Sequence, residues 1–340
     1  MSAKKLNIVF YYYPSLWMNT GGLQNQILLT KEALEELGHT VFFYEDWIRD
    51  KDKIKIDIYH QFSCNYSIFK LFSEIKSLGN KIVLSSVFND DKSIKNILAS
   101  KFDDIGVPIL FHNSVKKMIR NVDQIISLGL SETKDLIKYS NPRKEIIEIP
   151  NGVSKPIMNY DIRTIIKEDY IVCVGAINKR KNQLSLIKIC NELNLNLILI
   201  GPNTKTEIKY INQCKKIAGE NVTFLGYMDN NSNEFMEIIS KAKLFVLPSL
   251  NEVLPISVFE ALILGTPVVC TQNSSVGTYL KKEDGCLLCD PKSHKSIVTA
   301  IKSMYGFKMD HNLIASFKEK YNWDSVAKKI EDVYFETLKY

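Results

Sequence analysis

Residues 243–271, KLFVLPSLNEVLPISVFEALILGTPVVCT, contain one complete unit of a parallel α/β sheet. The apolar run Leu244–Leu247 is too short for a stable helix and rich in branched and aromatic side chains, as expected of a buried strand. Polar residues then break the run, and Pro255 suits a helix start, where the N–H that proline lacks would have no partner. Apolar side chains recur at helical spacing in Ile256–Ile263, before a second strand, Val268–Cys270. This order predicts a doubly wound α/β fold.

Two carboxylates in this unit, Glu252 and Glu260, are separated by seven residues. Glu252 lies in the predicted loop after the first strand, and ligands of open α/β sheets bind beyond the carboxyl ends of the strands. The adjoining helix N-terminus offers free N–H groups to a phosphate. Glu260 lies more than one turn into the helix, where a carboxylate can accept hydrogen bonds from a diol such as a ribose. Two solvated surface glutamates are the simpler interpretation, but this placement favours a ligand site.

The same stretch resembles a known family. Asn251–Ala261 followed by Gly265–Val269 is similar to the E-x7-E signature of the retaining glycosyltransferases of family four, also called glycosyl transferases group 1, which have the GT-B fold. The resemblance implies that Glu260 holds the ribose of a nucleotide-sugar donor. It also implies that Glu252 and the residues after it hold the donor sugar and pyrophosphate: Val253, Leu254, Pro255, Ile256 and Ser257. Val253 replaces the small residue that is usual in the family, which would narrow the sugar pocket.

Length and composition are those of a globular protein with two domains. The chain has 340 residues, of which 45% are hydrophobic and 24% charged, and domains usually have ~100–200 residues. No apolar window approaches the ~18 residues that a membrane-spanning helix needs. The net charge of +6 favours anionic ligands, but it is too small, without a recognisable motif, to indicate nucleic-acid binding. We expect a cytoplasmic protein.

The seven cysteines are scattered along the chain, as in proteins with reduced thiols. Cys286 and Cys289 form a C-x-x-C, but neither a second pair nor a nearby histidine completes a tetrahedral site. We therefore interpret them as core cysteines and expect no metal.

The loop after the first predicted strand, Asn7–Tyr12, contains Gly21 and Gly22 directly before an amphipathic helix pattern. A double glycine at such a turn lets the backbone approach a ligand closely. It is not the G-x-G-x-x-G of a dinucleotide site, which argues against a dehydrogenase. In the resembled family a GG loop here closes over the donor phosphates and the acceptor. The alternative is an ordinary flexible turn.

A further predicted strand, Ile56–His60, ends in a histidine. A neutral imidazole at the carboxyl end of a strand can bind an acceptor or transfer a proton, so His60 is a candidate catalytic residue. A histidine that hydrogen-bonds to a neighbouring loop is an equally good interpretation. Many members of the resembled family have a histidine near the end of the next strand, where Val87–Asn89 stand in this chain. A catalytic histidine therefore cannot simply be transferred from the family.

Three consecutive cations, Lys179, Arg180 and Lys181, follow the predicted strand Tyr170–Val174. At the carboxyl end of a strand they are well placed to bind a pyrophosphate, although an isolated basic run is usually a solvated turn. The resembled family has an arginine directly after the strand's glycine and a lysine five residues further on. Lys181 matches this lysine and becomes a candidate for catalysis and donor binding. Ala176 replaces the arginine, and we hypothesise that Arg180 supplies the missing charge.

Two other strand ends extend the expected donor site. Leu195–Ile200 runs into Gly201, and Asn221–Leu225 runs into a glycine and Tyr227. The resemblance places the nucleotide base in this region, so Gly201 and Tyr227 are expected to line the donor site.

The alternation of strands and helices occurs twice, which predicts two doubly wound, Rossmann-like domains facing a cleft. Residues 1–154 would bind the acceptor and residues 169–322 the nucleotide sugar, with residues 155–168 as a polar linker. In the resembled GT-B fold, the final helix, expected within residues 323–340, crosses back onto the first domain.

The resemblance implies transfer of a sugar from a UDP- or GDP-linked donor to a glycan or lipid-linked acceptor hydroxyl, with retention and without metal or cofactor. We expect a role in cell-surface polysaccharide or glycoconjugate biosynthesis. The basic segment Val115–Arg120 suggests peripheral contact with the inner face of a membrane, or a solvated helix face. The alternatives are another GT-B enzyme, such as a nucleotide-sugar epimerase or a sugar phosphorylase, and a catalytically silent sugar-nucleotide-binding subunit.

Overall fold

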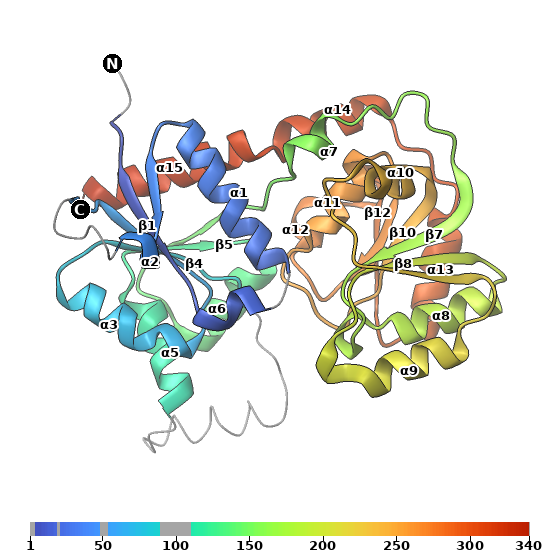
Figure 1. Ribbon diagram of the computed structural model, residues 1–340, viewed down its shortest axis with the longest axis horizontal. Helices are drawn as coiled ribbons and strands as arrows, with labels where there is room; N and C mark the ends of the chain where they lie inside the picture. Colours follow the sequence, from blue (N-terminus) through green and yellow to red (C-terminus); the bar gives the residue numbers. More distant parts are fainter. Residues whose placement is uncertain (1–3, 19–20, 48–53, 89–109, 340) are drawn as a thin grey trace. The chain divides into compact units, whose positions relative to one another are not determined.

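The computed structural model describes residues 4–18, 21–47, 54–88 and 110–339 (Figure 1). The chain forms two compact units. Unit 1 consists of Met1–Asn151 together with Trp323–Tyr340, and unit 2 consists of Gly152–Asn322. Asn89, which the sequence analysis discussed as part of Val87–Asn89, lies outside the described residues.

Unit 1 contains a six-stranded parallel sheet with the strand order β2-β1-β3-β4-β5-β6. Its strands are β1 (Asn7–Tyr11), β2 (Thr40–Phe43), β3 (Ile58–Phe62), β4 (Ile82–Ser85), β5 (Gln124–Ser127) and β6 (Ile146–Glu148). Its helices are η1 (Pro14–Met18), α1 (Gly22–Glu36), α2 (Tyr44–Trp47), η2 (Tyr66–Ile68), α3 (Phe69–Ser77), α5 (Leu110–Asn121), α6 (Leu130–Ser140) and α15 (Trp323–Lys339).

Unit 2 contains a second six-stranded parallel sheet, in the order β12-β11-β10-β7-β8-β9. Its strands are β7 (Glu168–Val174), β8 (Asn196–Ile200), β9 (Val222–Gly226), β10 (Ala242–Leu247), β11 (Val268–Thr271) and β12 (Cys286–Cys289). Its helices are α7 (Lys155–Asn159), η3 (Lys179–Lys181), α8 (Gln183–Glu192), η4 (Lys205–Glu207), α9 (Ile208–Ile217), α10 (Asn233–Lys241), α11 (Ile256–Ile263), α12 (Val276–Tyr279), η5 (Lys282–Asp284), α13 (His294–Met304) and α14 (His311–Lys320).

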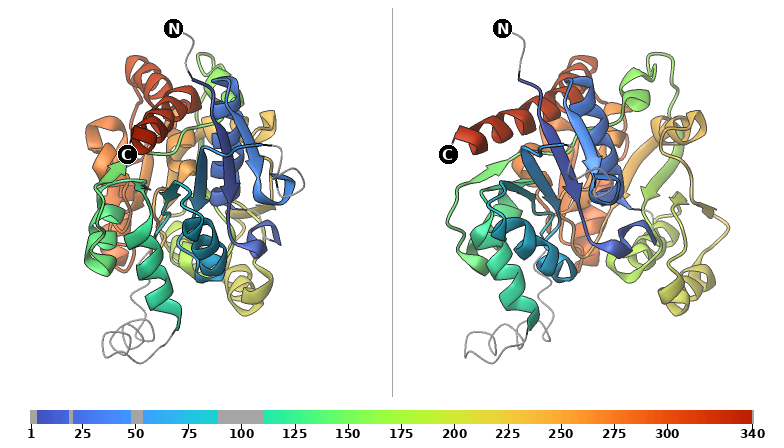
Figure 2. Two further views of the ribbon diagram at one scale, coloured as in Figure 1. Left: turned by 90° about the vertical axis from the view of Figure 1, so that its left-hand side faces the viewer. Right: turned by 60° about the vertical axis from the view of Figure 1, so that its left-hand side comes forward.

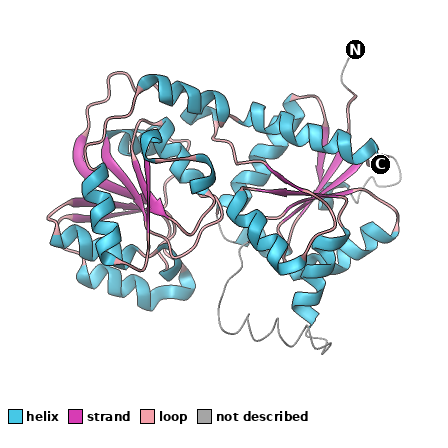
Figure 3. Ribbon diagram, turned by 180° about the vertical axis from the view of Figure 1, so that it is seen from behind, coloured by secondary structure: helices cyan, strands magenta, loops and turns pink. Residues whose placement is uncertain are grey.

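Helices flank both faces of each sheet, so the predicted α/β class with two Rossmann-like sheets is confirmed (Figure 3). In each sheet the chain first builds outward from one strand and later resumes on that strand's other side. The two switch points lie between β1 and β3 in unit 1 and between β7 and β10 in unit 2. The loops that leave adjacent strands at a switch point diverge, and ligands of doubly wound sheets bind there.

The segment expected to be a linker, residues 155–168, has regular structure at both ends. It contains α7, whose Ile157 is fully buried, and the first residue of β7. The structure groups the whole segment with unit 2, and the boundary between the units lies at Asn151. The polar composition that suggested a linker comes from the exposed stretch between the two elements.

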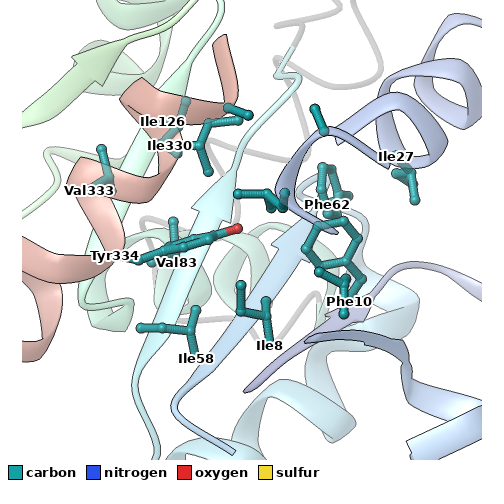
Figure 4. Packing of buried hydrophobic residues seen from close by; sticks show 14 of the residues in the cluster. Ile8, Phe10, Ile27, Ile58, Phe62, Val83, Ile126, Ile330, Val333 and Tyr334 are labelled. Atoms are coloured by element: carbon teal, nitrogen blue, oxygen red, sulfur yellow. The ribbon is translucent and has the colours of Figure 1, made fainter. Parts of the chain in front are cut away.

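The core of unit 1 includes the C-terminal helix α15. Its apolar residues recur at helical spacing and pack against one face of the sheet together with α1 (Figure 2). Figure 4 shows Tyr334 of α15 lying over the strands beside Ile58 and Val83. The even-numbered residues Ile8 and Phe10 of β1 face this layer, as the two-residue period of a strand requires.

His60 is part of this buried layer. The strand was expected to end at His60, but β3 runs from Ile58 to Phe62. All five of its residues are buried. His60 is therefore in the middle of the strand. Its Nδ1 lies 2.6 Å from the Tyr334 hydroxyl and its Nε2 lies 2.8 Å from Ser85 Oγ. Burial lowers the pKa of His60 to about 3, so the ring is neutral at physiological pH.

These contacts agree with the structural alternative for His60 and not with proton transfer to a substrate. The fully buried ring has both nitrogens in hydrogen bonds within unit 1. We therefore omit His60 from the catalytic residues proposed below.

Removing the Tyr334 hydroxyl should destabilise unit 1. Tyr334→Phe leaves a buried nitrogen of His60 without its partner, which costs about 1–3 kcal/mol. Urea unfolding of the purified chain measures the change. The matched control is Tyr66→Phe, the same deletion at a residue that is 51% exposed. Equal unfolding midpoints for the two variants would show that the buried hydrogen bond does not fasten α15.

Candidate functional site

Glu252 lies at the switch point of unit 2, in the loop that leaves β10. Two backbone hydrogen bonds tie this loop to the one after β11. Glu252 N–H donates to the Asn273 carbonyl (3.0 Å), and Ser275 N–H donates to the Val253 carbonyl (2.8 Å). The backbone at Glu252 is thus fixed against the loop after β11.

Two cations flank the Glu252 carboxylate. Lys181 Nζ lies 2.7 Å from Oε1, and Arg180 Nη1 lies 2.8 Å from Oε2. Arg180 also donates to the Asn251 carbonyl at 3.0 Å. The side chains of Glu252 and Lys181 are 9% and 12% exposed, whereas half of the Arg180 side chain faces solvent.

Burial and charge act on Glu252 in opposite directions. Burial by itself raises the pKa of a carboxyl group, but the attraction to Lys181 and Arg180 outweighs burial here, and the pKa of Glu252 lies below its ordinary value. Glu252 is therefore ionised at neutral pH. The cluster of two cations and one anion has a net charge of +1.

Asparagines on either side of the basic run hold it in place. Asn178 Oδ1 accepts a hydrogen bond from Lys181 N–H at 3.0 Å and caps η3. Asn182 has a left-handed backbone, with φ of 59°, a conformation that asparagine tolerates well. Its Nδ2 donates to the carbonyls of Pro248 (3.1 Å) and Pro291 (3.0 Å). Asn182 thus joins the loops after β7, β10 and β12, a role that sequence analysis missed.

Two glycines allow the strand ends to approach closely. Gly201 has φ of +148°, and a Cβ at this position would lie 2.2 Å from the Gly175 carbonyl oxygen. The predicted site residue Gly201 thus keeps the end of β8 against the end of β7. A Cβ on Gly175 would lie 2.9 Å from the side chain of Lys181, which crosses over this glycine.

Ala176, which stands where the resembled family has an arginine, contributes its backbone. Its carbonyl accepts a hydrogen bond from Gln183 Nε2 at 3.0 Å. Arg180 brings a guanidinium to the same cluster from the neighbouring turn, where it meets Glu252. That Arg180 replaces the charge of the family's arginine stays a prediction.

Glu260 lies in α11 and is almost fully buried. Asn230 Nδ2, from the loop after β9, donates to its Oε1 at 2.9 Å, and its Oε2 accepts no hydrogen bond from the described residues. Burial raises the pKa of Glu260 to about 7, and the Asn230 hydrogen bond opposes this shift. No sequence signal pointed to Asn230.

The N-terminus of α11 lies between the two glutamates. Pro255 is the N-cap, and Ile256 and Ser257 precede the first residues whose amides have intrahelical acceptors. Both are partly exposed, whereas Leu254 is buried. Their amides and the dipole of α11 can therefore receive an anion.

The remaining predicted residues lie apart from this cluster or in unit 1. Tyr227 follows β9 and is exposed. Gly21 and Gly22 belong to unit 1, where Gly21 is the N-cap of α1. Cys286 and Cys289 are buried in β12. No group of three or more metal-ligating side chains is found among the described residues.

The family profile that matches the chain has the description "Glycosyl transferases group 1" and covers residues 161–320, most of unit 2. Residues 161–320 thus resemble that family. The uncharacterized glycosyltransferase MJ1607 of Methanocaldococcus jannaschii is 29% identical over 235 residues, which are 62% of this chain and 59% of MJ1607. The O-antigen chain mannosyltransferase RfbU of Salmonella typhimurium is 24% identical over 227 residues, with 65% and 62% coverage. The chain thus spans about three fifths of the length of these relatives.

Solved structures with the same fold cover nearly the whole chain. Sucrose-phosphate synthase (tll1590) of Thermosynechococcus elongatus has a TM-score of 0.76 at 15% identity, with 98% of this chain and 99% of that chain covered. Anabaena Alr3699/HepE, solved in complex with UDP, has a TM-score of 0.72 at 12% identity, with 96% and 99% coverage. Together with the two parallel sheets, these similarities confirm the predicted GT-B fold.

Substituting Gly201 should disrupt the strand ends that carry the site. Gly201→Ala places a Cβ against the Gly175 carbonyl, and we expect unit 2 to lose at least ~3 kcal/mol of stability in urea unfolding. Gly226→Ala is the matched control, since Gly226 also has a positive φ, +76°, but open space around it. Its expected loss is ~1 kcal/mol. Equal losses would contradict the close approach of β7 and β8.

At pH 8, replacing Glu260 by glutamine should raise the free energy of unfolding, whereas the same replacement of Glu252 should lower it. Because the pKa of Glu260 is raised to about 7, the native state binds more protons than the unfolded state between about pH 4.5 and 7. Its contribution to the unfolding free energy therefore falls across this window, by on the order of 3 kcal/mol. Glu260→Gln should remove this loss and gain stability relative to wild type at pH 8, but not at pH 4.5.

Glu252→Gln provides the comparison. The pKa of Glu252 is lowered, so its stabilising contribution is fully present above the ordinary pKa and is lost only as pH falls below it. This variant should be destabilised by a constant amount from pH 5 to 8. Urea unfolding across this pH range measures both variants. A pH-independent effect of Glu260→Gln would show that Glu260 is not buried as described.

Proposed function

We propose that this chain is a retaining glycosyltransferase that moves a sugar from a nucleotide-sugar donor to a hydroxyl of a glycan or lipid-linked acceptor, without a metal. The observation that carries the proposal is the cluster of Lys181, Arg180 and Glu252 at the switch point of unit 2, close in sequence to the α11 N-terminus and Glu260. The match of residues 161–320 to the glycosyltransferase profile and the E-x7-E spacing support the same assignment.

In this proposal each part of the donor has its own partner. The Glu260 carboxylate accepts hydrogen bonds from the ribose diol, for which its Oε2 is open. The amides of Ile256 and Ser257 receive the pyrophosphate at the start of α11. Glu252, held by Lys181 and Arg180, orients the donor sugar beside Val253 and Leu254.

The chemical task is to stabilise the departing nucleoside diphosphate. Negative charge grows on its phosphate as the bond to the sugar breaks, and preorganised cations lower the energy of that state. Lys181 and Arg180 are held in place by Glu252 before any donor arrives, so little reorganisation is needed. Their net positive charge is delivered by the protein itself, which is why the proposal needs no metal.

Similar proteins support a sugar-nucleotide substrate. RfbU is named an O-antigen chain mannosyltransferase, and HepE was solved with UDP. By analogy we propose a UDP- or GDP-linked donor and a role in cell-surface polysaccharide or glycoconjugate biosynthesis, with Tyr227 and Gly201 near the base.

We further propose that the protein works in the cytoplasm, in peripheral contact with the inner face of a membrane. No helix in the described ranges is long and apolar enough to cross a bilayer. Helix α5 is amphipathic: Val115, Met118 and Ile119 are buried, whereas Lys117 and Arg120 are exposed.

A catalytically silent sugar-nucleotide-binding subunit is the second candidate. Ala176 in place of the family's arginine and Val87 in the region of its histidine favour it. Such a subunit would bind the nucleotide and transfer no sugar. An epimerase, in contrast, would convert the donor without an acceptor.

Calorimetric titration of UDP, GDP and ADP into the full chain tests the donor site. We expect one nucleotide to bind, and Lys181→Ala and Glu260→Ala each to weaken it ~10–100-fold, the usual effect of losing a charged hydrogen bond. Lys179→Ala is the matched control, since it removes a cation from the same short helix η3 with no ion pair to Glu252. Binding of no nucleotide, or equal binding by all the variants, would refute the assigned site.

A further inference from the structure

The switch point of unit 1 presents an exposed tryptophan. Strand β1 leads directly into η1, whose Trp17 is 44% exposed. The Trp17 ring packs edge-on against Tyr12, with centroids 5.5 Å apart, and against Phe43 at 6.3 Å. Tyr12 follows β1 and Phe43 ends β2, so the three rings form a cluster at the carboxyl ends of these two strands. Ligands of this fold class bind at that edge.

Trp17 is held in place by the residues around it. Leu16, in η1, is buried, and its carbonyl accepts a hydrogen bond from Gln24 Nε2 at 2.9 Å. The same buried Gln24 accepts a hydrogen bond from Gly21 N–H at 3.0 Å. One side chain of α1 thus hydrogen-bonds to the backbone of both Leu16 and Gly21. A rigid aromatic surface loses little conformational entropy when a ligand covers it.

The segment around Trp17 is uncharged. No aspartate, glutamate, lysine, arginine or histidine occurs from Leu6 to Thr30, in a chain in which 24% of residues are charged. The first cation after this segment, Lys31, donates to the Val41 carbonyl and pairs with Glu35. Among the residues from Tyr13 to Leu28 whose burial is described, the exposed ones are uncharged: Pro14, Ser15, Trp17, Gly21, Gly22, Asn25 and Leu28.

We propose that Trp17 is the platform of an acceptor subsite and that the acceptor presents an uncharged sugar ring there. A sugar ring has an apolar face of C–H groups, which packs against the electron-rich face of an indole. Its hydroxyls need only neutral partners, such as the exposed Ser15 and Asn25. This inference rests on the proposed transferase function and deepens it by naming the acceptor class.

The absence of charge in this segment is what selects the ligand. A carboxylate acceptor, such as a hydroxy acid or a uronic acid, would find no cation from Leu6 to Thr30 to balance its charge. Lys31, whose Nζ lies 5.8 Å from the Phe43 ring centroid, is already bound to the Val41 carbonyl and Glu35. An anionic membrane would likewise find no basic residue there, and a single tryptophan buries too little surface to hold a protein on lipid.

Binding of simple glycosides to the full chain tests the subsite without requiring transfer. The probes are the methyl glycosides of glucose, galactose, mannose and N-acetylglucosamine, with methyl glucuronide and L-malate as charged counterparts. Saturation-transfer NMR reports binding, and indole fluorescence reports whether a ring covers a tryptophan. We expect at least one neutral glycoside to bind and neither charged probe to do so.

Three variants identify the residue. Trp17→Ala should weaken the neutral glycoside about ten-fold, as the loss of one aromatic contact of about 1.4 kcal/mol predicts, while Trp17→Phe should stay within about three-fold of wild type. Leu28→Ala is the matched control, because Leu28 is also 44% exposed but lies on α1. It should bind as wild type does.

The inference is overturned if no neutral glycoside binds, if a charged probe binds better, or if Trp17→Ala binds as tightly as wild type. It is also overturned if wild type, but not Trp17→Ala, co-sediments with phosphatidylcholine vesicles, which would assign Trp17 to a membrane. Nucleotide titration of the same Trp17→Ala sample separates the two hypotheses. If wild type and Trp17→Ala both bind the nucleotide but glycoside binding does not depend on Trp17, only the acceptor subsite is refuted. If wild type binds no nucleotide, the donor function is refuted.

Discussion

The ion pairs of Glu252 with Lys181 and Arg180 are the constraint on which the rest of the site depends. A carboxylate so shielded from water stays ionised only if opposite charge lies within a few ångströms. Lys181 and Arg180 provide this charge at 2.7 and 2.8 Å. A backbone hydrogen bond of 2.7 Å from Leu250 N–H to the Arg180 carbonyl joins the same two loops. The ion pairs and this backbone bond together join the loops after β7 and β10.

Glu260 shows how differently the same residue type behaves eight positions later. It is buried without a cation, and its pKa is raised to about 7 instead of lowered. Its environment resembles that of a binding group waiting for hydrogen-bond donors, since Asn230 satisfies only one of its two oxygens. An incompletely paired buried carboxylate destabilises the ligand-free protein. Such a cost is common in binding sites, because the ligand supplies the missing hydrogen-bond donors.

The two units differ in the charge that they place at their switch points. In unit 2, the loops after β7 and β10 bring together two cations and a carboxylate, as an anionic donor requires. In unit 1, the loop after β1 is uncharged and presents an aromatic ring. The two sheets are both doubly wound. Under the two proposals made above, unit 2 binds an anionic ligand and unit 1 a neutral one. A neutral acceptor then does not compete for the phosphate-binding groups.

Local sequence was sufficient for the fold and for part of the site. The strand–loop–helix–strand pattern of residues 243–271 predicted β10, α11 and β11, since periodicity and proline act over a few residues. The sequence also placed Glu252 and the basic run before Asn182 directly after strands, where the structure has them. Their role in donor binding stays a prediction. Tertiary structure alone decided which side chains meet. It turned His60 from a strand-end candidate into a core residue, because neighbours distant in the sequence, Tyr334 and Ser85, surround it. It also brought Asn182 and Asn230 to the site across loops whose contacts no local pattern encodes, since hydrogen bonds between loops depend on strand order and not on sequence spacing.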